Sequence, residues 1–322
     1  MKGYGKRAYL KRITAIAAAI AISLAAVSFY AHAETVTYHD SGDDAAAELR
    51  EAMRQRQKNV IIGLTGSTDQ AGLKEAIGRL VDRALEHTGK PDEGDYLKFQ
   101  YATYKGQART TDADGAAAVE IDYLLKYYDD REQEDEVDKA VEAIMEDLQL
   151  DGLSEYEKIE AIYDRVCDTI KYEAAEENDH IRRTAYGALV EGKAVCQGYS
   201  LALYRLLLEA GIDNRIIFGE YVDPEGAGVA HTWNIVRLYG KYYYMDVTRD
   251  DSLDSREYFL RPAGSSFEDD HRADAEYSAK SFTGKYPMAQ EEFKWDLQGS
   301  ACRIVRSLTA LEEAVREGTA AE

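Results

Sequence analysis

Apolar and polar residues alternate along this chain with periods that predict both helices and strands. Apolar residues recur at helical spacing in four stretches, residues 43–57, 69–87, 132–150 and 154–170. Short apolar or alternating runs predict strands at residues 60–64, 96–104, 117–123, 214–222, 230–238 and 241–247. Asp112-Ala113-Asp114-Gly115 predicts a hairpin turn between two of these strands. The pattern predicts a protein of the α+β class.

The chain divides into four parts on these patterns. Residues 1–33 hold a basic start, an apolar stretch and a small-x-small site, Ala31-His32-Ala33, which together predict a cleaved signal peptide. An uncleaved membrane anchor is the alternative, because the apolar stretch is near the length that spans a bilayer. Residues 34–150 predict a small α/β accessory domain without a recognisable chemical motif, residues 151–262 a second domain, and residues 263–322 a C-terminal extension.

The charge of the chain limits its partners. All 322 residues carry a formal charge of −21, from 39 basic and 60 acidic residues. Residues 1–33 hold five basic and no acidic residues, so their removal leaves 34 basic residues and a charge of −26. Nucleic acids and anionic membrane surfaces attract basic patches, so neither is an expected partner. We expect a secreted, extracellular or cell-envelope protein, bound to the membrane only if the signal segment is retained.

Three cysteines are too few for a disulfide scaffold. Cys167 lies on the apolar face of the helix predicted at 154–170, as a core residue would. Cys302 lies in a strand-like stretch near the C-terminus, and a Cys167–Cys302 bridge has no support in the pattern. Cys196 alone precedes a strongly apolar run, Leu201 to Leu208, which ends with Gly211 as a helix C-cap.

Cys196 is therefore expected at the N-terminus of a buried helix. Unpaired N–H groups and the positive end of the helix dipole favour a thiolate there. A thiolate nucleophile needs an imidazole to carry the proton, and His231 on a predicted strand offers one. A two-residue turn at Tyr239-Gly240 would pair His231 with Thr248 and place His231 diagonally from Asp246 on one face of the sheet, roughly 7–8 Å apart at Cα. A turn one residue longer would separate them.

Three motifs in order carry a family resemblance: GKAVCQGYS at 192–200, HTWNIV at 231–236 and YGKYYYMDVT at 239–248. Together they resemble the core of the transglutaminase-like superfamily, papain-related cysteine enzymes found in many secreted bacterial proteins. The resemblance covers roughly residues 154–262. It implies a papain-like fold in which a nucleophile helix packs on an antiparallel sheet. It also implies that Cys196 is the nucleophile, His231 the general base and acid, and Asp246 the group that orients the imidazole.

The chain departs from the family at one position and leaves one role open. Arg249 stands where the family often has an aromatic residue. Tyr186, Gln197 and Trp233 are candidates for the oxyanion site or cleft, because Val190 occupies the place of the papain glutamine. A further histidine, His271, is expected to be a surface or packing residue.

These patterns predict a secreted cysteine protease, amidase or transglutaminase that transfers acyl groups through a thioester. Hydrolysis is favoured over cross-linking, because no calcium motif or dedicated amine site can be read in the sequence. No cofactor or metal is expected. The expected partner is a protein or peptide substrate, either free or associated with the cell wall. The alternative is a non-catalytic cell-envelope module that binds peptides or proteins on the same fold.

Overall fold

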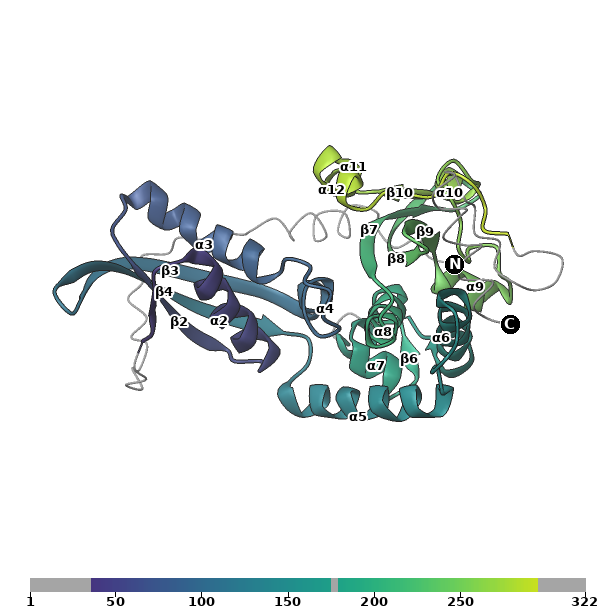
Figure 1. Cartoon of the computed structure of the whole chain (residues 1–322), viewed down its shortest axis with the longest axis horizontal. Coiled ribbons are helices and arrows are strands. Elements are labelled where there is room, and N and C mark those ends of the chain that lie inside the picture. The colour runs from purple at the N-terminus through teal and green to yellow at the C-terminus, as the bar shows by residue number, and fades with distance from the viewer. Residues whose placement is uncertain (1–35, 175–178, 295–322) are drawn as a thin grey trace, which may run out of the picture.

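The computed structural model describes residues 36–174 and 179–294, which form two layered parts side by side (Figure 1). The N-terminal part is a sheet covered by two helices, and the second part packs helices against another sheet. Helix α5 (Arg131–Leu148) connects them and runs along the bottom of the view. The predicted signal segment at 1–33 and Cys302 lie outside the described residues. Within these residues, no helix is both long and apolar enough to span a membrane.

The N-terminal sheet has the strand order β1-β2-β4-β3. Its strands are β1 (Tyr38–His39), β2 (Asn59–Thr65), β3 (Tyr101–Ala113) and β4 (Ala116–Tyr127). Helices α2 (Gly42–Arg54) and α3 (Gln70–Ala84) cover one face, where alternate strand residues such as Ile62 and Ile121 meet Leu49 and Val81. The predicted helices, the strand at 60–64 and the hairpin turn are confirmed.

The strand predicted at 96–104 is wrong over its first half. Asp95 to Gln100 form a short helix, α4 (Asp95–Gln100), and β3 begins at Tyr101. Five of the six helix residues are buried, so the segment lacks a polar face that would reveal its period. Asp95 accepts two hydrogen bonds from Arg215 and one from the main-chain N–H of Ile216, all in the second part of the molecule. Contacts distant in sequence thus stabilise the helix.

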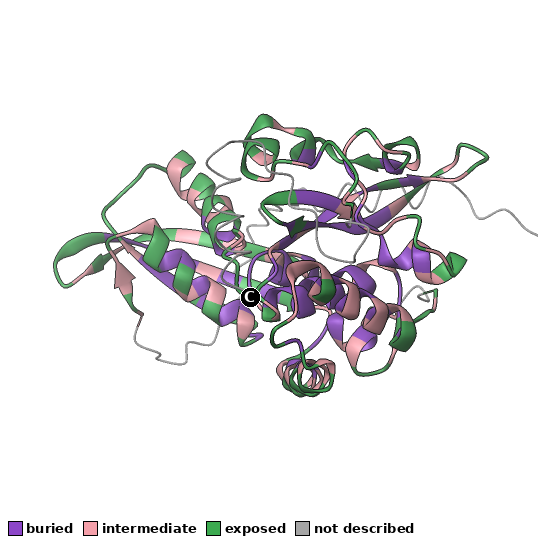
Figure 2. Cartoon of the chain, turned by 45° about the vertical axis from the view of Figure 1, so that its right-hand side comes forward, coloured by how far each residue is buried: buried purple, intermediate pink, exposed green. Residues whose placement is uncertain are grey.

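The second part is an α+β core, as predicted. Its antiparallel sheet has the order β10-β7-β8-β9, formed by β7 (Asn214–Val222), β8 (Gly228–Leu238), β9 (Lys241–Met245) and β10 (His271–Ala273). The helices are α6 (Glu155–Thr169), α7 (Ala185–Leu189) and α8 (Cys196–Glu209). Figure 2 shows buried residues concentrated where helices and strands pack together.

Helix α8 is the centre of this core. All residues from Gly198 to Leu208 are buried, and the apolar ones share one hydrophobic cluster with α6, α7 and the inner face of the sheet. The predicted ends of the helices are confirmed: Gly211 after α8 has φ +78°, and Ser154 forms a capping box with Glu157 at the start of α6. Ser200 on α8 hydrogen-bonds Thr232 on β8, which fixes the helix against the strand.

The strand predicted at 241–247 ends early, at Met245. The predicted pairing is confirmed up to that point, since Leu238 pairs with Lys241 and Asn234 with Met245. Asp246 then caps helix α9 (Val247–Leu253) by accepting a hydrogen bond from the N–H of Arg249. Thr248 therefore lies in a helix rather than opposite His231.

Residues 263–294 cover the outer face of the sheet. They include α10 (Phe267–Asp270), α11 (Ala275–Ser278) and α12 (Lys280–Lys285), together with β10, which pairs with β7. Phe267 and Tyr277 pack there with Trp233 and Ile235 in a separate cluster. Two minor strands, β5 (Lys171–Tyr172) and β6 (Lys193–Ala194), pair in parallel, and a 3₁₀ turn η2 (Ile181–Arg183) precedes α7.

Candidate active site

Cys196 is the first residue of α8, as its sequence context predicts. The N-cap residue is Val195, whose side chain cannot accept a hydrogen bond. No capping side chain therefore pairs with the first N–H groups of the helix, beside Cys196. Burial alone would raise the pKa of the Cys196 thiol. The positive charge of His231 and hydrogen bonds from His231 and Thr232 outweigh burial and hold the pKa below its ordinary value. The site therefore favours a thiolate.

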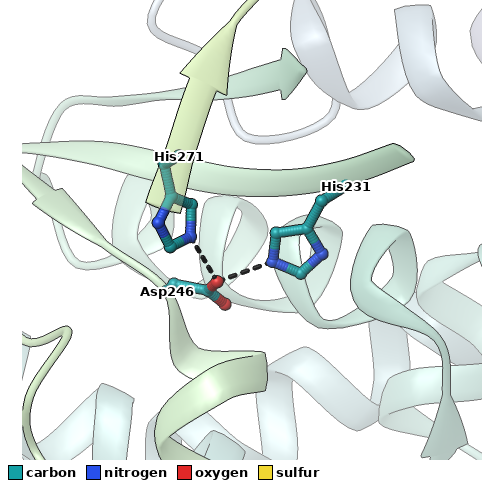
Figure 3. A group of neighbouring side chains, drawn as sticks. All are labelled: His231, Asp246 and His271. Atoms are coloured by element: carbon teal, nitrogen blue, oxygen red, sulfur yellow. Dashed lines mark hydrogen bonds and ion pairs between the residues drawn. The ribbon is translucent and has the colours of Figure 1, made fainter. Parts of the chain in front are cut away.

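His231 on β8 connects the thiol to a carboxylate. Its Nε2 lies 2.6 Å from Oδ2 of Asp246 (Figure 3), which leaves Nδ1 for Cys196. Burial lowers the pKa of His231, but the negative charges of Asp246 and Cys196 raise it to about 10. A raised pKa on the imidazole and a lowered pKa on the thiol both favour the thiolate–imidazolium ion pair, which activates a cysteine nucleophile.

Asp246 is fully buried and accepts hydrogen bonds on both carboxylate oxygens. Oδ1 accepts from the N–H of Arg249 at 3.1 Å, and Oδ2 accepts from His231. Its own main-chain N–H donates to the carbonyl of Tyr258. Burial opposes ionisation, but His231 holds the pKa of Asp246 well below its usual range. The structure thus places His231 and Asp246 in direct contact, and Cys196 at the start of α8 interacts electrostatically with His231.

His271 corrects a sequence-based expectation, because it is neither on the surface nor a simple packing residue. It is buried at the start of β10, and its Nε2 lies 2.9 Å from the same Oδ2 of Asp246 (Figure 3). The local sequence, Asp270-His271-Arg272, is polar and reads as exposed. The pairing of β10 with β7 places the ring, and no short-range pattern reveals that pairing.

Comparison with known proteins agrees with this geometry. The profile of the Transglutaminase-like superfamily matches residues 142–247, a range that holds Cys196, His231 and Asp246. This segment belongs to the transglutaminase-like superfamily. No match is found among curated proteins.

Solved structures similar to the chain include a TGase, with 14% identity, a TM-score of 0.33 and coverage of 70% of this chain and 63% of that one. A proposed cysteine protease from Cytophaga hutchinsonii has 11% identity, a TM-score of 0.32 and coverage of 54% and 69%. The periplasmic domain of TgpA from Pseudomonas aeruginosa has 16% identity, a TM-score of 0.27 and coverage of 46% and 66%. The chain thus spans just under two thirds of the TGase structure.

The three candidate oxyanion donors of this transglutaminase-like core differ in their surroundings. Desolvation and the negative charge of Glu136 on α5 raise the pKa of Tyr186, and Gln197 Nε2 donates to the carbonyl of Phe99 at 2.6 Å. Trp233 stacks on the ring of His231 with centroids 6.2 Å apart. Its buried Nε1 has no hydrogen-bond partner among the described residues, and the side chain borders a cavity of about 230 Å³ beside His271.

Arg249 has a defined role at the position where the transglutaminase-like family often has an aromatic residue. Its guanidinium lies 4.2 Å from the ring centroid of Tyr221 and donates to the Tyr221 hydroxyl at 2.9 Å. The Tyr221 ring lies 6.0 Å from that of His231. Arg249 therefore covers an aromatic wall of the site and positions Asp246 through its N–H.

The described residues contain one group that could hold a metal ion, His231, Asp246 and His271, whose ligand atoms lie within 4.8 Å of one another. In the structure, Nε2 of each histidine instead lies within hydrogen-bond distance of Oδ2 of Asp246. Cys167 is also a free thiol, but burial and nearby acidic residues, Asp251 first among them, raise its pKa to about 12. Of these two thiols, only Cys196 is placed as a nucleophile.

Proposed function

We propose that this protein is a secreted transglutaminase-like cysteine enzyme that transfers acyl groups from peptide or carboxamide bonds. The observation that carries the proposal is the pairing of His231 with Asp246 beside Cys196 at the start of α8, where the charge of His231 lowers the pKa of the thiol. A nucleophile, a base and an orienting carboxylate in contact are the parts that acyl transfer by a cysteine requires.

The reaction follows from the charges of these groups. The Cys196 thiolate attacks the carbonyl carbon, and the carbonyl oxygen takes the negative charge near the first N–H groups of α8. The tetrahedral intermediate collapses as the C–N bond breaks, and the His231 imidazolium gives its proton to the departing nitrogen. A thioester remains on Cys196. His231 then takes a proton from water or an amine, whose attack releases the acyl group and regenerates the thiolate.

We favour water over an amine as the acceptor, so that the protein is a protease or amidase rather than a cross-linking enzyme. The basis is the sequence, in which neither a calcium motif nor a dedicated amine site can be recognised. We further propose a protein or peptide substrate at the cell envelope. The charge of −21 for the whole chain would attract cationic peptides at low ionic strength. The amino-terminal pattern at 1–33 supports export.

The proposal is tested by trapping the thioester. The purified protein would be incubated with a mixture of peptides, including glutamine-containing ones, with and without a labelled primary amine, and Cys196 would be examined by mass spectrometry. We expect an acyl adduct on Cys196 that water removes, and peptide products absent from a Cys196→Ala variant. An amine adduct as the main product would make the protein a transglutaminase. Retention of peptides by both wild type and Cys196→Ala, with neither adduct nor product, would establish the binding module instead.

A further inference from the structure

A second histidine reaches Asp246 from outside the family match. His271 lies beyond residue 247, where the match ends, and yet its Nε2 is 2.9 Å from the oxygen that binds His231. Figure 3 shows the two rings approaching Asp246 from different sides. One carboxylate oxygen therefore accepts from two imidazoles, and the three-residue site of the family has an additional neighbour in this chain.

His271 is itself held by a second carboxylate. Its Nδ1 lies 2.6 Å from Oδ1 of Asp270 and 3.2 Å from the carbonyl oxygen of Phe267. The hydroxyl of Tyr258 donates to the other oxygen of Asp270 at 2.7 Å. Both nitrogens of His271 therefore lie within hydrogen-bond distance of carboxylate or carbonyl oxygens. Acidic and basic groups thus alternate from Cys196 to Asp270.

Aromatic packing fixes the orientation of this ring. Phe267 stacks on His271 with centroids 3.9 Å apart and planes at 21°, and Trp233 meets it edge-on at 4.9 Å. Only 1% of the His271 side chain is exposed. A buried imidazole held on its face, its edge and both nitrogens has little freedom to rotate, and it can therefore restrict the group that it contacts.

The strand that carries His271 packs unusually close to its neighbour. His271 pairs with Tyr221 on β7, and Ala273 pairs with Gly219. A Cβ atom at Gly219 would lie 2.1 Å from the carbonyl oxygen of Arg272, so glycine is what permits this approach. The fold thus provides a specific place for β10, and with it for the imidazole.

We propose that His271, backed by Asp270, is a positioning residue of the acyl-transfer site that fixes the plane of the Asp246 carboxylate. The inference rests on the function proposed above. The Arg249 N–H on Oδ1 and two imidazoles on Oδ2 leave the carboxylate a single orientation, the one in which it binds His231. Without His271 the carboxylate can turn, and less of its negative charge is compensated near the thiolate. Both effects raise the pKa of Cys196.

The test is the rate at which iodoacetamide alkylates Cys196 between pH 4 and 9, located by mass spectrometry. His271→Phe keeps a stacked ring but donates no hydrogen bond, whereas His271→Gln keeps a donor near the position of Nε2. The titratable and charged groups around the ring, which stay unchanged in both variants, are Asp246, Asp270, Tyr258, Tyr221, His231 and Arg249. His87→Phe is the matched control, because His87 bonds Tyr204 and Asp213 away from the site.

We expect His271→Phe to move the acid limb of the profile up by about one pH unit, which lowers the rate by up to about tenfold at pH values below the wild-type limb. His271→Gln should recover most of that loss, and His87→Phe should match the wild type. Thermal unfolding of each variant measures any loss of stability separately. If His271 had only a structural role, its replacement would lower stability without shifting the pH dependence of Cys196 alkylation. If His271→Phe does not fold, His271→Asn replaces it, since its amide reaches Asp270 but not Asp246.

An unchanged limb in His271→Phe, or equal loss in His271→Gln, would overturn the positioning role while leaving the enzyme reading intact. A wild-type Cys196 that reacts as an ordinary thiol and ignores His231→Ala would overturn the proposed function itself. Stoichiometric divalent metal in the purified protein, whose removal by EDTA changes the profile, would also overturn the inference, because His231, Asp246 and His271 would then be ligands.

Discussion

Asp246 lies one residue past the end of β9, yet its Oδ2 is 2.6 Å from Nε2 of His231 on β8. Continuing the strand register would place Trp233 opposite Asp246, so the contact with His231 is diagonal. The two oxygens of the carboxylate have separate roles, since Oδ1 caps α9 and Oδ2 binds the imidazole. Variants of Asp246 and His231 can therefore separate the chemistry of the site from its stability.

His231→Ala should convert Cys196 into an ordinary thiol. The imidazolium is the main favourable charge beside the thiolate, and its own pKa of about 10 keeps it protonated across neutral pH. Wild-type Cys196 should alkylate at pH 6 at a nearly pH-independent rate. In the variant the alkylation rate should follow the ionisation of a thiol with a pKa of about 8.5. The rate at pH 6 should then be lower than that of the wild type by a factor on the order of a hundred. Labelling rates from pH 4 to 9 check this.

Cys167 provides the internal control for that experiment. Burial raises its pKa to about 12, so it should label slowly at every pH in the range and should not respond to His231→Ala. Labelling of Cys196 at the same pH as a free thiol, with or without His231, would contradict the ion pair.

Asp246→Asn and Asp246→Ala should differ in stability more than in activity. Loss of the carboxylate charge removes the group that stabilises the His231 imidazolium, so both variants should lose turnover by roughly 10³- to 10⁴-fold. Asparagine can still cap α9 through its side-chain oxygen, but alanine cannot. The free energy of unfolding of Asp246→Ala should therefore be about 1 kcal/mol lower than that of Asp246→Asn. Peptide turnover and urea unfolding measure the two effects. Equal stability of the variants would show that the cap contributes nothing.

The sequence predicted the parts of the site that depend on local pattern. Cys196 precedes an apolar helix that ends at a glycine, and the two-residue turn at Tyr239-Gly240 sets the pairing of β8 with β9. His271 could not be found in this way, because its place depends on β10 pairing with a strand about fifty residues earlier in the chain. The helix at Asp95–Gln100 was missed for a related reason, since burial on all sides removes the polar face.

Asp95→Ala should destabilise the protein although it lies far from Cys196 in sequence. Asp95 is 1% exposed and accepts two hydrogen bonds from Arg215, at 2.7 and 2.8 Å, which join α4 to β7. Removing the carboxylate leaves a largely buried guanidinium unpaired, which costs about 3–5 kcal/mol. Asp92→Ala is the matched control, because Asp92 pairs with Arg54 at a more exposed position and should cost about 1 kcal/mol or less. Urea unfolding of both variants measures the difference, and similar losses would contradict a special role for Asp95.

The stabilisation by Asp95 should depend on pH with a definite sign. Burial opposes ionisation of this carboxyl, but Arg215 and the N–H of Ile216 hold its pKa below the ordinary value of about 3.9. A carboxyl whose pKa is lower in the folded than in the unfolded state stabilises the fold above the unfolded pKa, and this contribution is lost as the pH falls through the folded value. The difference in unfolding free energy between wild type and Asp95→Asn should therefore be constant from about pH 5 to 7 and shrink below about pH 4. Urea unfolding at half-unit steps from pH 2.5 to 7 provides the measurement. A difference that instead grows on acidification would mean that Asp95 is protonated in the folded protein and does not form the ion pair.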